Sequence, residues 1–189
     1  MINRIGSHMI FVNDLAKHVH ILLAGGVSAI PTEGVWGISC SISKEHAIER
    51  ILRVKQRDPA KGLITLVATF DELVHWFACP VLEVAHDEVG RPSTWIIPVN
   101  SDCPRILTGG RDSMAVRRVT MPSLVQLINY VGPLVSTSAN RSGRLACQSR
   151  WQVMNQLGHV VDHVAQGRTQ GYRKPSTIRD MQTGTIIRD

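Results

Sequence analysis

The stretch from Pro133 to Gly143 reads Pro-Leu-Val-Ser-Thr-Ser-Ala-Asn-Arg-Ser-Gly, with apolar residues first and polar residues after them. The apolar start and the alternation that follows it predict a strand that ends within this stretch. The hydroxyl, amide and cationic groups offer many hydrogen-bond donors in a small volume, which suits a loop around an anion or a polar ligand. A turn whose Ser and Asn side chains bond to their own backbone explains the same composition. The choice between the two depends on the rest of the chain.

The chain has 189 residues, enough for one domain with a substantial core. Apolar residues make up 43% of it, and no apolar run has the roughly 18 residues of a membrane helix, so we expect a soluble globular protein without membrane contact. Gly6-Ser7-His8-Met9 is typical of a cloning remnant, so residues 1–8 are set aside and a single domain is predicted over residues 9–189.

The cysteines and histidines predict no metal site. The cysteines are Cys40, Cys79, Cys103 and Cys147, and they have neither metal-ligand spacing nor the density of a disulfide framework. Together with the lack of a visible secretory signal, they favour a reducing, cytoplasmic location. His159 and His163 are four residues apart, but no third ligand is near them in the sequence, so ordinary histidines are the stronger interpretation.

Positive charge is concentrated in the second half of the chain. Residues 1–103 have 9 basic and 11 acidic side chains, a net charge of −2, whereas residues 104–189 have 12 basic and 4 acidic side chains, a net charge of +8. Such a field favours a phosphate-bearing ligand or a nucleic acid as partner, although improved solubility alone is an alternative explanation.

Interleaved helix and strand patterns predict an α/β (mixed α+β) fold with one mixed sheet covered by helices. Helical spacing is found over residues 13–24, 44–55, 71–77, 122–130 and 149–157, with a further helix considered at 81–89. Strands are predicted over residues 27–30, 63–68, 93–98, 113–118, 159–164, 176–180 and 185–188, in addition to the strand that starts at Pro133 and ends within residues 136–143. Ser43 is the predicted N-cap of the helix at 44–55.

Four polar loops each adjoin a predicted core element, so we expect them to meet at one edge of the sheet. They span residues 32–36, 55–61, 136–143 and 171–177. They supply cations, hydroxyls and one aromatic face but little that serves as a nucleophile or base, a set that suits phosphoryl or nucleotidyl transfer. Simpler explanations are a hairpin turn with a packed tryptophan for the first loop and cations at a helix C-terminus for the second.

Several of these segments, in order, resemble the motifs of the YrdC/TsaC family. They are Pro31-Thr32-Glu33, Lys55-Gln56-Arg57, Lys61-Gly62-Leu63 and residues 136–143, and segments 107–109, 112–117 and 176–180 follow the same pattern. The resemblance extends from about Asp14 to the end of the chain. It implies a twisted mixed β-sheet flanked by helices, YrdC-like, with a concave basic cavity. Gly34, Asp58 and residues 90–92 depart from the usual pattern, which affects the expected loop shapes but removes no proposed ligand.

The resemblance also implies an activity. The family makes threonylcarbamoyl-adenylate (threonylcarbamoyl-AMP) from L-threonine, bicarbonate or CO2, and ATP, and it releases pyrophosphate. The product feeds threonylcarbamoylation of the adenosine beside the anticodon of certain tRNAs. ATP is then a substrate, accompanied by Mg2+, and no tightly bound cofactor or protein-held metal is expected. The implied partners are tRNA and the proteins that transfer the threonylcarbamoyl group.

By resemblance, two groups of residues form the site. The ATP-binding residues are Lys55, Arg57, Lys61, Ser138 and Asn140, of which Lys55 and Arg57 also act in catalysis. The threonine-binding residues are Thr32, Arg117, Ser176 and Thr177, and Trp36 forms a wall of the pocket.

Two other functions remain open from the sequence. An RNA-binding or ribosome-maturation factor would use the same basic cavity without synthase activity, but aromatic residues that stack on bases are few, at 5% of the chain. A paralogue with the same fold and a different carbamoylated substrate is the third possibility, since a fold does not determine a substrate.

Overall fold

The computed structural model describes residues 14–81, 92–172 and 175–188. The strands are β1 Ser28–Pro31, β2 Trp36–Ser41, β3 Ile64–Val67, β4 Ser93–Pro98, β5 Ser113–Arg118, β6 Leu134–Ser138, β7 His163–Val164, β8 Thr177–Asp180 and β9 Ile186–Arg188. Among these residues, the α-helices are α2 Glu45–Lys55, α3 Arg105–Thr108, α4 Pro122–Val131 and α5 Arg150–Leu157, and residues 14–23 are also helical. Two 3-10 helices span Pro59–Lys61 and Phe70–Trp76.

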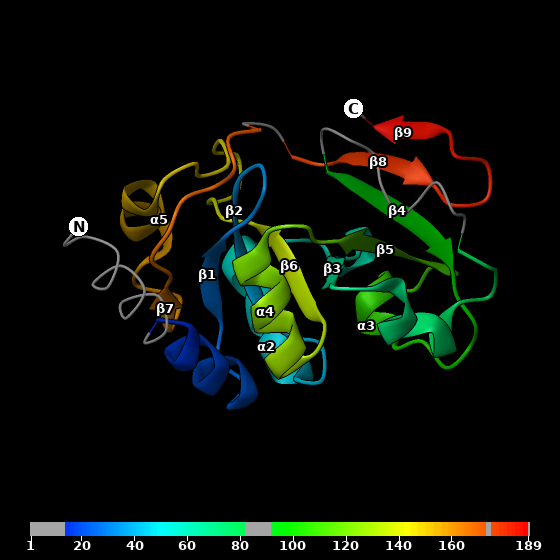
Figure 1. The fold of residues 1–189 in the computed structure, drawn as a ribbon, viewed down its shortest axis with the longest axis horizontal. Helices are drawn as coiled ribbons and strands as arrows, with labels where there is room; N and C mark the ends of the chain where they lie inside the picture. The colour runs from blue at the N-terminus through cyan, green and yellow to red at the C-terminus, as the bar shows by residue number, and fades with distance from the viewer. Residues whose placement is uncertain (1–13, 82–91, 173–174, 189) are drawn as a thin grey trace, which may run out of the picture.

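All of these strands join one mixed, twisted sheet, with helices on its flanks (Figure 1). The strand order is β7-β1-β2-β6-β3-β5-β4-β8-β9. Strand pairs β1/β7, β3/β5 and β4/β8 are parallel, and the other neighbours are antiparallel. The predicted fold class is therefore confirmed.

Most predicted elements form close to their predicted bounds, but β2 is not predicted. Its six residues alternate between larger apolar side chains and glycine or serine, and all six are buried. Gly37, Ser39 and Ser41 have low strand propensity, so they hide the pattern in the sequence. The strand is nevertheless central, because it pairs with both β1 and β6.

Three further predictions need correction or cannot be followed. Ser43 does not cap α2: the N-cap is Lys44, without a side-chain hydrogen bond, and the Ser43 hydroxyl lies 3.0 Å from that of Ser41. The strand predicted at 159–164 is reduced to the two residues of β7. The helix considered at 81–89 lies, apart from its first residue, outside the described residues.

The core lies between the sheet and its helices, in two clusters. The larger one joins α2, α4 and α5 to strands β1, β2 and β6, and Trp36 is completely buried within it. The smaller one lies among β3, β4, β5 and the 3-10 helix Phe70–Trp76. Within the described ranges, no helix is long and apolar enough to cross a membrane.

Strand register places residues of four central strands on one face of the sheet. Gly37 of β2 is opposite Ser138 of β6. Ser136 is opposite Ile64 of β3, and Leu66 of β3 is opposite Arg117 of β5. Because paired residues and alternate residues share a face of the sheet, these six residues all lie on the same face. This face forms the floor of the candidate site.

Candidate functional site

A cavity of about 160 Å³ lies over this face. It is lined by Thr32, Val35, Trp36, Gly37, Arg57, Leu63, Ile64, Leu66, Arg117, Ser136, Thr137, Ser138, Pro175, Ser176 and Arg188. All four predicted polar loops contribute to this lining. The cavity covers the face of the central strands, however, and not the sheet edge where we expected the loops to meet.

The cavity brings together six of the predicted site residues. These are Thr32, Trp36, Arg57, Arg117, Ser138 and Ser176. Lys55, Lys61, Asn140 and Thr177 are not among its lining residues. Of these four, Lys55 and Asn140 support Ser138 through direct hydrogen bonds.

Lys55 is a buried lysine at the end of α2, with 7% of its surface exposed. Its ammonium donates to three oxygens: the Ser138 carbonyl at 2.9 Å, the Asn140 carbonyl at 2.6 Å and the Asn140 Oδ1 at 2.7 Å. Burial, and then the charge of Arg57, lower the pKa of Lys55 to about 8. The side chain is therefore still protonated at pH 7, with all three of its donors engaged.

Asn140 holds the polar loop after β6 in shape. Its Oδ1 accepts a hydrogen bond from the Ser138 hydroxyl at 2.8 Å. Its Nδ2 donates to the carbonyls of Arg141 and Arg144. The loop is thus a turn held by side-chain hydrogen bonds, and through Ser138 it also forms a wall of the cavity. The polar-turn and ligand-binding interpretations of its sequence are therefore compatible.

Arg57 reaches the cavity because the chain turns sharply after Lys55. Gln56 has φ 45°, a left-handed conformation that is uncommon for a residue other than glycine, and it ends α2. The Arg57 guanidinium then donates to the carbonyls of Gly62 at 3.0 Å and Lys61 at 3.4 Å. Lys61 itself is exposed and contributes its backbone carbonyl here.

The cavity is rich in cations. Burial, and then the nearby charges of Arg111 and Arg188, lower the pKa of Arg57. Arg57, Arg117 and Arg188 all line the cavity, and no carboxylate is among its described lining residues. An anionic ligand would relieve the repulsion between Arg57 and Arg188.

Arg117 is not a fully free cation, because it is paired beneath the cavity. Its Nη2 lies 3.2 Å from Oε2 of Glu33, and both side chains are almost completely buried. Glu33 Oε1 also accepts from the backbone amides of Thr120 and Met121, at 2.9 and 3.4 Å. Glu33 thereby joins the β1–β2 loop to β5 and to the start of α4.

The loop between β1 and β2 is a hairpin connection that also forms one wall. The Thr32 hydroxyl donates to the Val35 carbonyl at 2.7 Å and closes the loop. Trp36 begins β2 and is packed in the core, yet it also lines the cavity. Among the described residues, its buried indole nitrogen has no hydrogen-bond partner. Both interpretations of this loop, packed hairpin and ligand wall, therefore hold.

The far wall comes from the end of the chain. Ser176 is buried, and its hydroxyl lies 2.6 Å from that of Thr94 in β4. Arg188 of β9 completes this wall. Sequence reasoning missed Arg188, since a single arginine near the chain end has no distinguishing pattern, and it assigned no ligand role to Ser136 or Thr137. The i, i+2 spacing of Ser136 and Ser138 on a predicted strand is the signal that would have found Ser136.

Sequence comparison identifies close relatives. The Sua5/YciO/YrdC family model, described as "Telomere recombination", matches residues 20–189. The chain is 40% identical over 182 residues to a threonylcarbamoyl-AMP synthase of Xanthomonas euvesicatoria, which covers 93% of this chain and 97% of the relative. It is 40% identical over 171 residues to a protein of the same name from Stutzerimonas stutzeri, covering 89% and 92%.

Solved structures show the same fold. P. abyssi Sua5 complexed with L-threonine superposes with a TM-score of 0.80 at 27% identity over 91% of this chain. This chain spans only 52% of that larger protein. E. coli YciO has a TM-score of 0.75 at 24% identity, with 93% of this chain and 88% of YciO covered, a likeness that concerns the fold alone. With the family model matched over residues 20–189, the chain belongs to the Sua5/YciO/YrdC family.

Proposed function

We propose that this chain is a threonylcarbamoyl-AMP synthase, which makes threonylcarbamoyl-adenylate and pyrophosphate from L-threonine, bicarbonate or CO2, and ATP. The observation that carries the proposal is the arginine-rich cavity formed by the motif residues, in a chain 40% identical to proteins of that name over nearly their whole length. These relatives support the synthase and not the alternative RNA-binding or ribosome-maturation factor.

The size of the cavity suggests which substrate enters it. Sites for drug-sized ligands have volumes of roughly 300 Å³ or more. At about 160 Å³, this cavity suits a molecule the size of threonine, so the nucleotide would extend toward the cavity mouth. We assign Thr32, Arg117, Ser176 and the neighbouring Thr177 to the threonine side, where hydroxyls and a cation meet the hydroxyl and carboxylate of the amino acid.

The remaining cations suit a triphosphate. Arg57 and Arg188 would neutralise phosphate oxygens, Lys61 would add a charge from the exposed loop, and Ser138 would contact the nucleotide. Lys55 and Asn140 would keep Ser138 in position. Mg2+ would arrive with ATP, since it binds through substrate phosphates more often than in protein-only cages.

The chemistry needs positioning and charge stabilisation more than a nucleophilic side chain. The threonine amine attacks CO2 and loses a proton, which gives a carbamate. A carbamate oxygen then attacks the α-phosphorus of ATP, and the bond to the β-phosphate oxygen breaks to release pyrophosphate. Arginines around the phosphates stabilise the negative charge that develops in this step, and the walls of the cavity align the carbamate with the phosphorus.

The setting of the enzyme is part of the same proposal. Residues 9–189 would form one YrdC-like catalytic domain. The product would pass to proteins that transfer the threonylcarbamoyl group to tRNA, and the enzyme would work in the cytoplasm, where tRNA, ATP and threonine are available. Direct contact with tRNA would use the positive charge of the second half of the chain.

Pyrophosphate release provides the test. The purified protein is incubated with ATP, Mg2+ and bicarbonate, with L-threonine or with L-valine, which has a similar shape but lacks the hydroxyl. We expect release that depends on threonine and is much slower with valine, because the hydroxyl contacts would be lost. Arg57→Gln should reduce release strongly, whereas Arg53→Gln, on the exposed face of α2, should not. Release that does not depend on threonine would contradict the proposal.

A further inference from the structure

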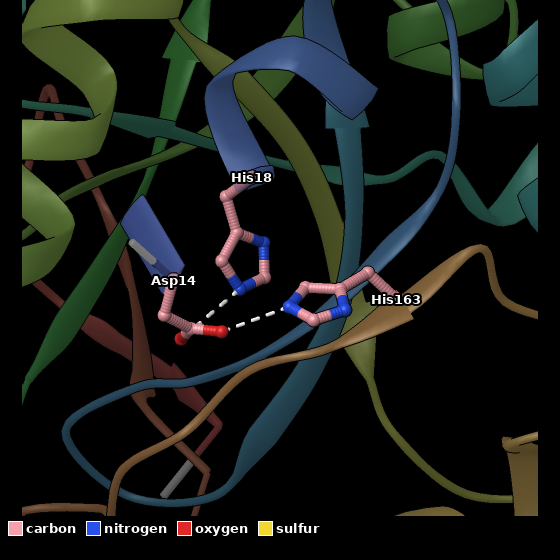
Figure 2. Close-up of side chains that lie close together, drawn as sticks. All are labelled: Asp14, His18 and His163. Carbon is pink, nitrogen blue, oxygen red and sulfur yellow. Dashed lines mark hydrogen bonds and ion pairs between the residues drawn. The ribbon is translucent and has the colours of Figure 1, made fainter. Parts of the chain in front are cut away.

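A second polar cluster lies outside the cavity described above. Figure 2 shows the side chains of Asp14, His18 and His163 converging on one point. Asp14 and His18 come from the helical residues 14–23, and His163 comes from β7, far away in the sequence. His159, four residues before His163, lies instead 3.2 Å from the Arg141 guanidinium.

The geometry of the cluster is close to that of a metal site. Nε2 of His163 lies 2.8 Å from Oδ1 of Asp14, and Nε2 of His18 lies 3.6 Å from its Oδ2. One ligand atom from each residue can be chosen so that all three lie within 4.8 Å of one another. Ligand distances near 2.0 Å place neighbouring donors of a tetrahedral zinc ion roughly 3.3 Å apart, so only small side-chain shifts would be needed.

His18 is the unusual member of the cluster. It is 4% exposed, and neither of its ring nitrogens has a hydrogen-bond partner within the described part of the chain. A buried polar group without a partner costs about 1–3 kcal/mol. The Asp14–His163 hydrogen bond, at 2.8 Å, forms without His18, which keeps only the longer contact of 3.6 Å with the Asp14 carboxylate.

The space beside the cluster allows a further ligand. Asp14 and His18 both line a cavity of about 130 Å³, whose other walls include the apolar side chains of Leu15, Ile30 and Leu124. Three protein ligands with room for a water in the fourth position are a common arrangement for zinc.

We propose that Asp14, His18 and His163 bind one divalent transition-metal ion of the Zn2+ class. Two imidazole nitrogens and one carboxylate oxygen suit zinc and its neighbours, whereas Mg2+ prefers a shell of oxygens. The ion takes the free ring nitrogen of His18 as a ligand. It is distinct from the Mg2+ that accompanies ATP.

A backbone amide orients the Asp14 carboxylate. The amide of Gln166 donates to Asp14 Oδ2 at 2.8 Å, the kind of outer contact that fixes a ligating carboxylate.

Metal binding would cross-link distant parts of the chain. Residues 14–23 lie beside β7 and β1, at the end of the sheet opposite β9 (Figure 1). The ion would fasten this helix to β7, and because only the folded protein presents all three ligands together, binding would stabilise the fold.

The test is a titration of the metal-free full chain with Zn2+, followed by calorimetry and by thermal unfolding. We expect one saturable site and a rise in Tm, with no such rise for Mg2+. His18→Gln and Asp14→Asn should weaken the binding at least roughly tenfold, the loss that an outer-shell contact alone can cause. His20→Gln is the matched control, because His20 is exposed on the same helix. Co2+ bound to the wild type should give the visible absorption of a low-coordinate nitrogen and oxygen site, and Asp14→Asn should abolish it.

Two results would overturn the proposal. One is the absence of saturable binding at one Zn2+ per chain in the wild type. The other is an unchanged affinity in folded Asp14→Asn or His18→Gln protein, which would place the ion on other histidines of the chain. Far-UV circular dichroism shows whether each variant is folded, and Asp14→Asn, which preserves side-chain size, decides the question if His18→Gln does not fold.

Discussion

The ammonium nitrogen of Lys55 lies 2.7 Å from Oδ1 of Asn140, and it also contacts the carbonyl oxygens of Ser138 and Asn140. The end of α2 is therefore fastened directly to the loop that follows β6. The Ser138 hydroxyl donates to the same Oδ1 atom, at 2.8 Å. Lys55 and Ser138, which lines the cavity, thus donate to the same acceptor atom. Lys55 lies outside the cavity wall, but through this acceptor it can fix the position of Ser138.

This brace should make the activity depend on pH. Burial, and then Arg57, bring the pKa of Lys55 down to about 8, so the ammonium loses its third donor as the pH rises through that value. Because three oxygens accept hydrogen bonds from it, the loop should loosen in the deprotonated form. We expect threonine-dependent pyrophosphate release to fall above about pH 8.

A matched variant separates this effect from titration of the substrate. Lys55→Arg keeps its charge throughout this pH range. Its activity should be lower than that of the wild type because the guanidinium cannot reproduce the three contacts, but it should show no fall near pH 8. Identical high-pH profiles for the two proteins would show that Lys55 does not set the dependence.

Arg188 should contribute to ATP binding although it lies outside the family motifs. It lines the same cavity as Arg57, and its charge lowers the pKa of that residue. A charge-assisted hydrogen bond is worth about 1.5–3 kcal/mol, so Arg188→Gln should raise the KM for ATP about tenfold or more. Steady-state kinetics measures this, with Arg53→Gln as the exposed control. Equal KM values in the two variants would remove Arg188 from the site.

The buried ion pair of Glu33 and Arg117 should contribute to the stability of the fold as well as to the structure of the site. Glu33→Gln keeps an oxygen for the Thr120 and Met121 amides but leaves the Arg117 charge uncompensated. Loss of one partner from a buried pair costs about 3–5 kcal/mol. We expect a decrease of about 3 kcal/mol in the free energy of unfolding, measured with urea.

Two further variants test whether this loss of stability comes from the unpaired charge. Glu49→Gln, on the exposed face of α2, should change the free energy of unfolding by less than about 0.5 kcal/mol. The double variant Glu33→Gln with Arg117→Gln should recover part of the loss, since no buried charge would then remain unpaired. A Glu33→Gln protein as stable as Glu49→Gln would contradict the energetic role of the pair.

Hydrophobic periodicity, together with the proline and glycine residues at the ends of elements, predicted much of the fold. The predictions that failed did so for physical reasons. The helix at α4 was predictable because Pro122 begins it and Gly132 ends it around an apolar stripe. Strand β2 was missed although its apolar residues alternate with glycine and serine, the pattern of a strand. Its first residue, Trp36, was assigned to the polar loop at 32–36, and glycine and serine have low strand propensity.

The sequence predicted which loops form the site, but it did not predict which of their side chains contact one another. The sequence placed Arg57, Ser138 and Ser176 near one another through their motifs. The motifs also grouped Lys55 with Asn140, but as two nucleotide ligands; that Lys55 bonds to Asn140 itself, 85 positions away, was not predicted. The second cluster was missed for a similar reason: Asp14 and His163 are 149 positions apart, and His163 is held on β7 by its pairing with β1.

The turn that holds Arg57 should depend on a glycine in a neighbouring segment. Gly109 has φ 68°, and a Cβ atom there would lie 2.5 Å from the Pro59 carbonyl oxygen, 2.8 Å from that of Ala60 and 2.8 Å from the Gly62 nitrogen. These are backbone atoms that cannot swing aside. They belong to the segment whose Lys61 and Gly62 carbonyls accept hydrogen bonds from Arg57.

Gly109→Ala should therefore lower both stability and turnover, because the segment must shift and Arg57 moves with it. Gly132→Ala is the matched control: its φ is 77°, but a Cβ atom there has no neighbour within 4 Å. Both variants also carry backbone strain, and Gly132, with ψ −174°, lies in a region that is essentially restricted to glycine. The comparison therefore uses turnover: Gly109→Ala should lose threonine-dependent turnover and folded Gly132→Ala should keep it. Equal turnover in the two variants would show that the segment around Arg57 is not held by Gly109.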